Sequence, residues 1–152
     1  MTFNFNSTSS SETTKFAVSI GKKLRGNEVI SLTSDLGGGK TTFTKGLVKG
    51  SGSSDNVTSP SFNVKNEYTS AKFSIYHYDF YRLSEPGIIK QELEEALSMD
   101  NSVIILEWAQ VVSQALPRDT INIEIKVISE NSRSFNCTFA KEYSYLFERL
   151  SK

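Results

Sequence analysis

The stretch SDLGGGKTT, residues 34–42, decides the fold of this chain. It matches a phosphate-binding loop, in which glycines let backbone N–H groups point at phosphate oxygens and a lysine adds a positive charge. The apolar segment EVISLT over 28–33 precedes the loop and predicts a strand, and residues from about 40 to 49 predict a helix. Strand, loop and helix in this order form the context in which a glycine-rich stretch binds a nucleoside triphosphate.

Each residue type within the loop predicts a separate role. Gly37, Gly38 and Gly39 allow backbone conformations and a close approach that a Cβ atom would block. Lys40 is placed to contact the β- and γ-phosphates, and Thr41 has the hydroxyl that such loops place on Mg²⁺. The dipole of the helix that begins here also favours an anion.

Outside the loop, the hydrophobic pattern predicts a sheet with helices on both faces. The segment VIIL over 103–106 is fully apolar, as expected for a central strand that is covered on both sides. Ser9 and Glu12 match a capping box for an early helix, which Gly26 is placed to end. Further strands are predicted near 3–5 and over 62–68, 72–79, 120–128 and 133–139, and further helices over 85–99 and 141–150. We therefore expect one three-layer α/β domain over residues 1–152, with a mixed, partly antiparallel sheet.

Composition narrows the class of protein. Lys plus Arg and Asp plus Glu both number 17, so the chain offers no basic stripe for binding DNA or RNA phosphates. With one cysteine, Cys137, and one histidine, it can form neither an intrachain disulfide nor a Cys/His zinc cage. Cys137 is expected to be a packing thiol. The chain has no hydrophobic signal core and no apolar run long enough for a bilayer, so we expect a cytoplasmic protein with no membrane segment.

Two carboxylates accompany predicted strands. Glu107 directly follows VIIL, where phosphate-loop proteins place the acid that holds the metal or its water, although strand ends often carry a surface glutamate. Asp79 shares a strand face with His77 in the segment HYDFYR, residues 77–82, and is a candidate for positioning an attacking water. Taken alone, Asp79, His77 and Arg82 fit structural hydrogen bonds at a strand end better than catalysis.

Two further features stand beside these carboxylates. The segment VTSPSF, residues 57–62, has hydroxyls beside a proline and resembles a switch segment that orders around a γ-phosphate. By composition alone, an ordinary loop is the better interpretation. Trp108, which follows Glu107, is predicted to be a packing residue.

These segments, in this order, resemble the TsaE family (also called YjeE), small bacterial ATPases needed for threonylcarbamoyladenosine in tRNA. The family pattern is GDLGAGKTT, then an SPTF-like segment, then HxDxYR, then a hydrophobic strand that ends in EW. Here they stand as SDLGGGKTT, SPSF, HYDFYR and VIILEW, and the resemblance covers about residues 9–133. Three positions depart from the family pattern: Ser34 replaces its Gly, Gly38 its usual Ala, and Ala109 a frequent Pro.

The resemblance implies a role for each matched residue. Asp79, Lys40 and Glu107 would be the catalytic residues, with Asp79 positioning water or the metal. Thr41 and Glu107 would hold Mg²⁺. The residues implied to bind ATP are Ser9, Gly37, Gly38, Gly39, Lys40, Thr41, Thr42 and Arg133, and those implied to form the switch segment are Thr58, Ser59 and Ser61.

The resemblance also implies a fold and an activity. The fold would be a three-layer P-loop NTPase, and the activity a Mg²⁺-dependent ATP hydrolysis that is slow without a partner. The protein would act on the TsaB–TsaD complex, would not transfer the threonylcarbamoyl group itself, and would meet tRNA only indirectly. Two alternatives remain, a small-molecule P-loop kinase and a module that binds nucleotide without hydrolysing it. Such a kinase usually has a lid with several arginines, whereas those here are scattered, at Arg25, Arg82, Arg118, Arg133 and Arg149.

Overall fold

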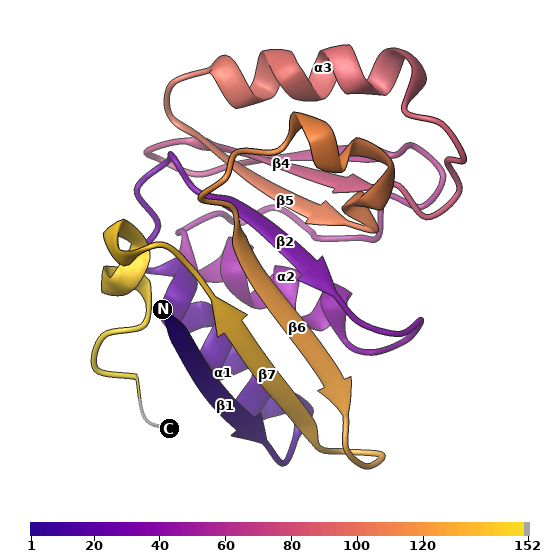
Figure 1. The fold of residues 1–152 in the computed structure, drawn as a ribbon. Helices are drawn as coiled ribbons and strands as arrows, with labels where there is room; N and C mark the ends of the chain where they lie inside the picture. Colours follow the sequence, from indigo (N-terminus) through magenta and orange to yellow (C-terminus); the bar gives the residue numbers. More distant parts are fainter. Residues whose placement is uncertain (151–152) are drawn as a thin grey trace.

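The computed structural model describes residues 1–150 and shows a seven-stranded mixed sheet in the order β1-β7-β6-β2-β5-β4-β3 (Figure 1). The strands are β1 (Thr2–Ser7), β2 (Val29–Thr33), β3 (Lys65–Thr69), β4 (Ser74–Asp79), β5 (Ser102–Glu107), β6 (Ile121–Val127) and β7 (Arg133–Thr138). The helices are α1 (Ser10–Gly21), α2 (Lys40–Gly50) and α3 (Gly87–Ser98), with two 3₁₀ helices, η1 (Ala109–Ala115) and η2 (Lys141–Leu146).

Strand β2 lies at the centre of the sheet, and the phosphate loop follows it directly. It pairs in parallel with β5 on one side and with β6 on the other, and β4 is parallel to β5. The outer pairs β3–β4, β6–β7 and β1–β7 are antiparallel. Because β2, β4 and β5 are parallel, their carboxyl ends meet at one edge of the sheet.

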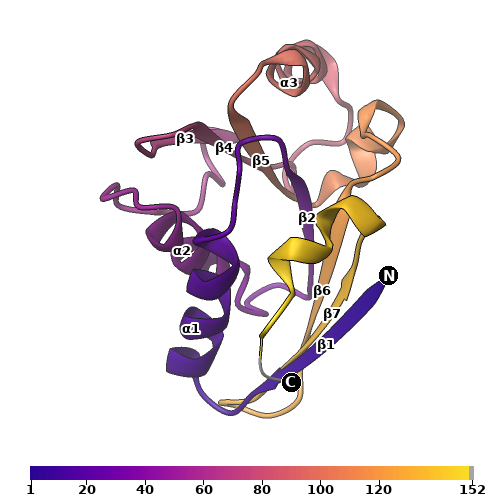
Figure 2. The ribbon, with the colours of Figure 1, turned by 90° about the vertical axis from the view of Figure 1, so that its left-hand side faces the viewer.

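Helices cover both faces of the sheet (Figure 2). One apolar core lies between the sheet and α1, α2 and η2, and includes Phe16, Phe43 and Phe135. The other lies between the sheet and α3 with η1, and includes Tyr78, Leu93 and Leu106. Burial of these side chains is the main favourable term in folding. The predicted three-layer α/β fold with a mixed sheet is confirmed.

The alternation of side chains decides which residues face the phosphate loop. In β5, Val103 and Ile105 lie in the core beneath α1 and α2, so Glu107 points to the same face. In β4, Ile75 lies in that core as well, so His77 and Asp79, at alternate positions after it, point to the same face. Asp79 pairs in register with Glu107, which places the two carboxylates side by side at the edge of the sheet.

Some predicted boundaries were wrong. Helix α1 begins as predicted, because the Ser9 hydroxyl accepts the Glu12 N–H at 3.1 Å, but it ends at Gly21. Gly26 instead turns the chain into β2 with φ +94°, and its N–H donates to the buried Glu28 carboxylate at 3.0 Å. The predicted closing helix is the 3₁₀ helix η2, which spans only Lys141–Leu146.

The strand predicted over 62–68 begins only at Lys65, because a turn comes first. The Val64 N–H donates to the Pro60 carbonyl at 2.7 Å, and Val64 has φ +64°. The last two residues of the predicted 1–152 domain lie outside the described ones. No helix within residues 1–150 is long and apolar enough to cross a membrane.

Candidate nucleotide site

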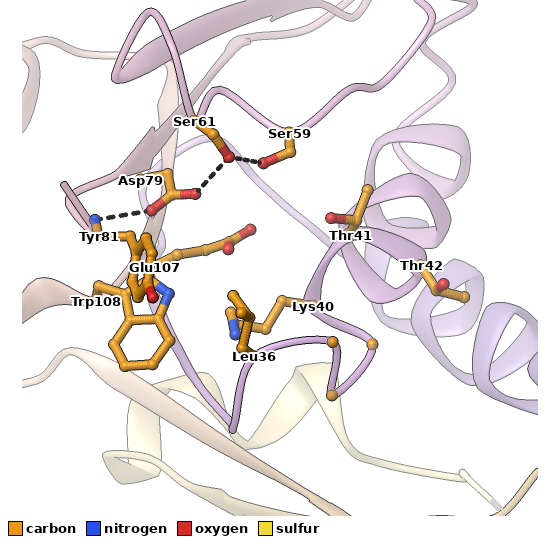
Figure 3. A pocket seen from close by; sticks show the side chains of 13 residues that line it. Leu36, Lys40, Thr41, Thr42, Ser59, Ser61, Asp79, Tyr81, Glu107 and Trp108 are labelled. Carbon is orange, nitrogen blue, oxygen red and sulfur yellow. Dashed lines mark hydrogen bonds between the residues drawn. The ribbon is translucent and has the colours of Figure 1, made fainter. Parts of the chain in front are cut away.

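A cavity of about 280 Å³ lies at the carboxyl ends of β2, β4 and β5 (Figure 3). The phosphate loop and the start of α2 form one wall, and residues at the ends of β4 and β5 form the other. Two residues of the predicted switch segment complete it. The lining residues are Leu36, Gly37, Gly38, Gly39, Lys40, Thr41, Thr42, Ser59, Ser61, Asp79, Tyr81, Glu107 and Trp108.

The loop has the backbone that a phosphate-binding loop needs. Gly37 and Gly39 have φ values of +74° and +107°, a region that favours glycine. Helix α2 begins at Lys40, so its first N–H groups point toward the cavity with the positive end of the helix dipole. Together with the loop N–H groups they form an anion site of the kind that holds phosphates.

Lys40 is buried, and its ammonium group lies within the loop. Its Nζ donates to the Ser34 hydroxyl at 2.9 Å and to the Asp35 carbonyl at 3.3 Å. The same nitrogen lies 4.9 Å from the centroid of the Trp108 ring, a cation–π contact. These contacts keep the ammonium group at the cavity wall. Phosphate oxygens would form stronger hydrogen bonds with it than the neutral hydroxyl and carbonyl oxygens do.

Ser34 and Gly38, two of the departures from the family pattern, are in contact with each other. The Ser34 hydroxyl accepts from Lys40 and donates to the Asp35 carbonyl at 2.8 Å. A Cβ atom on Gly38 would lie 2.7 Å from the Ser34 Cβ atom, which is too close for two carbon atoms. Serine therefore fits at position 34 because position 38 is glycine, a relation that the two residue types do not reveal by themselves.

The opposite wall holds the two carboxylates. Asp79 and Glu107 are both buried, with 6% and 3% of their surface exposed. Asp79 Oδ1 accepts the Tyr81 N–H at 2.9 Å, and the Ser61 hydroxyl donates to Oδ2 at 3.4 Å. Glu107 Oε1 lies 2.8 Å from His77 Nε2. In Figure 3, the Glu107 carboxylate points across the cavity toward Thr41.

The donors in the cavity fit Mg²⁺ rather than a softer metal. Within residues 1–150, no group of three or more His, Cys, Asp or Glu side chains comes together as a protein-only metal cage. Thr41 and Glu107 offer oxygen ligands on facing walls. Mg²⁺ is commonly held by one or two such protein oxygens, with waters and substrate phosphates completing its coordination.

Two predicted nucleotide contacts lie apart from this cavity. Arg133 lines a second, smaller cavity, and its Nε donates to the Gly38 carbonyl at 3.1 Å. Gly39 and Thr42 line both cavities, so the two spaces adjoin at the start of α2. The Ser9 hydroxyl caps α1, and the next residue, Ser10, lines the second cavity instead. A nucleotide contact by Ser9 or Arg133 stays a prediction.

Three aromatic or charged residues of the segments HYDFYR and VIILEW complete the description of this region. Trp108, predicted to pack, does pack against the core beneath α3, yet it also lines the cavity, with its ring centroid 5.0 Å from that of Tyr81. Arg82 lies outside both cavities, with its guanidinium 4.7 Å above the Phe62 ring. His77 contacts Glu107 directly, and the His-x-Asp spacing was the sequence signal that placed it on this face.

Comparisons with known proteins identify the family of this chain. The family model described as "Threonylcarbamoyl adenosine biosynthesis protein TsaE" matches residues 7–135. The protein named tRNA threonylcarbamoyladenosine biosynthesis protein TsaE in Rickettsia prowazekii is 37% identical over 93% of this chain and 96% of its own length. The protein of that name in Bacillus subtilis is 34% identical over 82% of this chain and 78% of its own. The crystal structure of Bacillus subtilis YdiB superposes with a TM-score of 0.78 at 29% identity, covering 97% of this chain and 93% of that one. The chain therefore belongs to the TsaE family.

Proposed function

We propose that this protein binds Mg·ATP in the larger cavity and hydrolyses it slowly, as an accessory ATPase in the threonylcarbamoyladenosine modification of tRNA. The observation that carries the proposal is the convergence of Lys40 and Thr41 with two buried carboxylates on one cavity. The names of the relatives place them in threonylcarbamoyladenosine biosynthesis, which supports the same pathway for this chain.

The residues of the cavity have separable roles in this reaction. The loop N–H groups and Lys40 bind and orient the phosphates, and Lys40 neutralises the charge that develops on the transferred group. Asp79 is placed to accept a proton from, and orient, the attacking water. Thr41 and Glu107 would hold Mg²⁺, which supplies further charge neutralisation when it is bound. The chemistry is mostly positioning and electrostatics, so a partner that completes the site can raise the rate.

Phosphate release from Mg·ATP tests the activity. We expect Glu107→Gln and Asp79→Asn to abolish release, while a fluorescent ATP analogue still binds in a titration. Glu94→Gln, which changes an exposed acid on α3, is the matched control and should behave as the wild type. Retained hydrolysis in both cavity variants would overturn the assignment of these carboxylates. No hydrolysis by the wild type, alone or with its partner, would favour a module that only binds nucleotide.

The proposed partner is the TsaB–TsaD complex. A pull-down of that pair with this protein, with and without Mg·ATP, should show an association that depends on nucleotide. An association that is equal in both conditions would contradict a nucleotide-controlled role. Of the five arginines, only Arg133 lines either cavity, which argues against the lid of a small-molecule kinase. A phosphorylated acceptor that forms faster than free phosphate would reverse that conclusion.

A further inference from the structure

His77 lies in β4, between Glu107 of β5 and Tyr68 of the edge strand β3. It is fully buried, and its two ring nitrogens contact two different side chains. Nε2 lies 2.8 Å from Glu107 Oε1, and Nδ1 lies 3.4 Å from the Tyr68 hydroxyl. Buried polar groups are generally hydrogen-bonded, so this ring links a cavity carboxylate to strand β3.

The chain of contacts continues to the surface. The Tyr68 hydroxyl donates to the Thr58 carbonyl at 3.1 Å, and Asn66 Nδ2 donates to the same carbonyl at 3.1 Å. Thr58 is exposed and belongs to segment 57–62, whereas Tyr68 and Glu107 are each 3% exposed. A buried carboxylate is thus connected, through two buried rings, to the backbone of a surface segment.

The number of available protons shows that this series of contacts can divide at the Tyr68 hydroxyl. An ionised carboxylate only accepts hydrogen bonds, so in the arrangement of an ionised Glu107 and a neutral His77, Nε2 is the donor to Glu107 and Nδ1 is an acceptor. The Tyr68 hydroxyl has one proton and two possible acceptors, the Thr58 carbonyl and His77 Nδ1. Burial raises the pKa of Tyr68, which keeps that proton in place. If Thr58 moves away, the Tyr68 hydroxyl can therefore donate to His77 Nδ1 in place of the Thr58 carbonyl.

The same segment has a second, shorter link to the cavity. The hydroxyls of Ser59 and Ser61 lie 2.7 Å apart, and Ser61 donates to Asp79 (Figure 3). Segment 57–62 is thus connected to both carboxylates, to Asp79 through one side chain and to Glu107 through Tyr68 and His77. Two links from one segment to the two acids of a site go beyond what packing of a buried histidine requires.

We propose that His77 is a positioning residue for Glu107, and that the relay Glu107–His77–Tyr68–Thr58 couples the orientation of this carboxylate to the position of segment 57–62. The inference rests on the proposed function in one respect only, namely that Glu107 acts on Mg·ATP. A movement of segment 57–62 on binding of a nucleotide or partner would thereby change the orientation of Glu107 in the cavity.

The first experiment measures the Mg²⁺ dependence of phosphate release in His77→Leu, His77→Gln and Tyr68→Phe. Loss of an outer contact to a metal ligand typically costs roughly 10- to 100-fold in metal affinity or activity. We expect the Mg²⁺ concentration for half-maximal activity to rise about tenfold or more in His77→Leu. His77→Gln, whose amide can still donate to Glu107, should lie between His77→Leu and the wild type. Nucleotide affinity measured in EDTA should stay unchanged.

Tyr76→Phe is the matched control, because it removes a buried tyrosine hydroxyl from the other face of β4, where its partner is the Met99 sulfur. It should leave the Mg²⁺ dependence as in the wild type. An unchanged Mg²⁺ dependence in folded His77→Gln and His77→Leu would overturn the proposal. So would a shift in Tyr76→Phe as large as that in Tyr68→Phe.

The second experiment needs no nucleotide and separates this proposal from the proposed function. Amide hydrogen exchange of segment 57–62 is compared in the wild type, Glu107→Gln and Tyr68→Phe. We expect faster exchange near Thr58 in both variants, because each alters one end of the relay. If the wild type hydrolyses no ATP, the proposed function fails, but this measurement still tests whether the relay exists. Unchanged exchange in Glu107→Gln, with faster exchange in Tyr68→Phe alone, would show that the relay does not reach the carboxylate.

Discussion

The two walls of the cavity are held in different ways. On the wall formed by the phosphate loop, every hydrogen bond made by the side chains of Lys40 and Ser34 joins residues at most six positions apart. On the carboxylate wall, His77 and Glu107 are 30 positions apart, and Ser61 and Asp79 are 18 apart. Apart from the hydrogen bond from Arg133 to Gly38 and the Trp108 ring beside Lys40, the first wall is held by contacts within the loop. The second wall exists only when several strands are in register.

This difference predicts how far the effect of a substitution travels. The effect of a substitution within the loop should be confined to the loop, and a second substitution there should reverse it. A change on the carboxylate wall should be felt in segments that lie far away in the sequence. The following predictions test that division, in order of decreasing effect.

Lys40→Ala is expected to have the largest effect. It removes a lysine that lines the cavity and the charge-assisted hydrogen bonds that this lysine would make to phosphate. Hydrogen bonds to charged groups contribute about 1.5–3 kcal/mol, so we expect ATP affinity to fall roughly 100-fold. A titration with a fluorescent ATP analogue measures this, with Lys45→Ala, an exposed lysine of α2, as the control. An affinity equal to that of Lys45→Ala would contradict the assignment of the loop.

Gly38→Ala tests whether the loop is self-contained. The new methyl group would meet the Ser34 side chain, so we expect about tenfold weaker nucleotide binding and a lower melting temperature. Ser34→Gly in the same chain should recover much of the loss. The coupling between contacting residues is typically 0.5–3 kcal/mol in a double-mutant cycle.

Gly37→Ala provides the control for that cycle. A Cβ atom there would meet nothing within 4 Å, although φ is +74°. Its cost is therefore backbone strain alone, about 1–2 kcal/mol, and Ser34→Gly should not relieve it. Equal rescue of both alanine variants, or of neither, would contradict the contact between positions 34 and 38.

Ser61→Ala tests the opposite wall with a smaller change. The contact from Ser61 to Asp79 is long, at 3.4 Å, so its loss should lower the rate of hydrolysis by less than about fivefold. Exchange of backbone amides in segment 57–62 should nevertheless increase, because one of its two links is gone. Ser53→Ala, in the polar connector before the segment, is the control. No change in exchange would argue that the segment is held by its backbone alone.

The smallest effect is expected at Cys137. Its side chain is fully buried in β7, and burial raises the pKa of the thiol to about 12. The thiolate is the reactive form, so a thiol reagent at neutral pH should modify the protein only after it unfolds. Cys137→Ala should leave hydrolysis unchanged. Rapid modification of the native protein would show that this edge of the sheet opens readily.

The loop wall was the part that sequence reasoning could predict. Residues 34–42 carry their own conformational requirements, and the strand before them and helix after them have clear hydrophobic patterns. Glu107 lines the cavity, and the fully apolar segment directly before it was the signal in the sequence for its place at a strand end. In each case the deciding information lies within about ten residues of the position.

The rest depended on contacts between distant residues. The link from His77 to Glu107 needs the parallel register of β4 with β5, and the link to Thr58 needs the antiparallel register of β3 with β4. The parallel register joins segments far apart in the sequence, and the hairpin register depends on the turn between Ser70 and Phe73, so the residue types at positions 58, 77 and 107 do not reveal either link. The turn that delays β3 comes from a positive φ at Val64, a β-branched residue for which local propensity predicts an extended conformation. The contact between Ser34 and Gly38 depends on the folded loop.

The central place of β2 has a consequence for the order in which the molecule is made. Both of its neighbours, β5 and β6, belong to the last third of the chain. Parallel strands far apart in sequence pair slowly, because a long loop must close before any of their contacts form. During synthesis, β2 must wait for β5 and β6 before its backbone is paired on both sides. We therefore expect the capacity to bind nucleotide to appear late, after the strand at Ile121–Val127 has been made, although the loop itself spans residues 34–42.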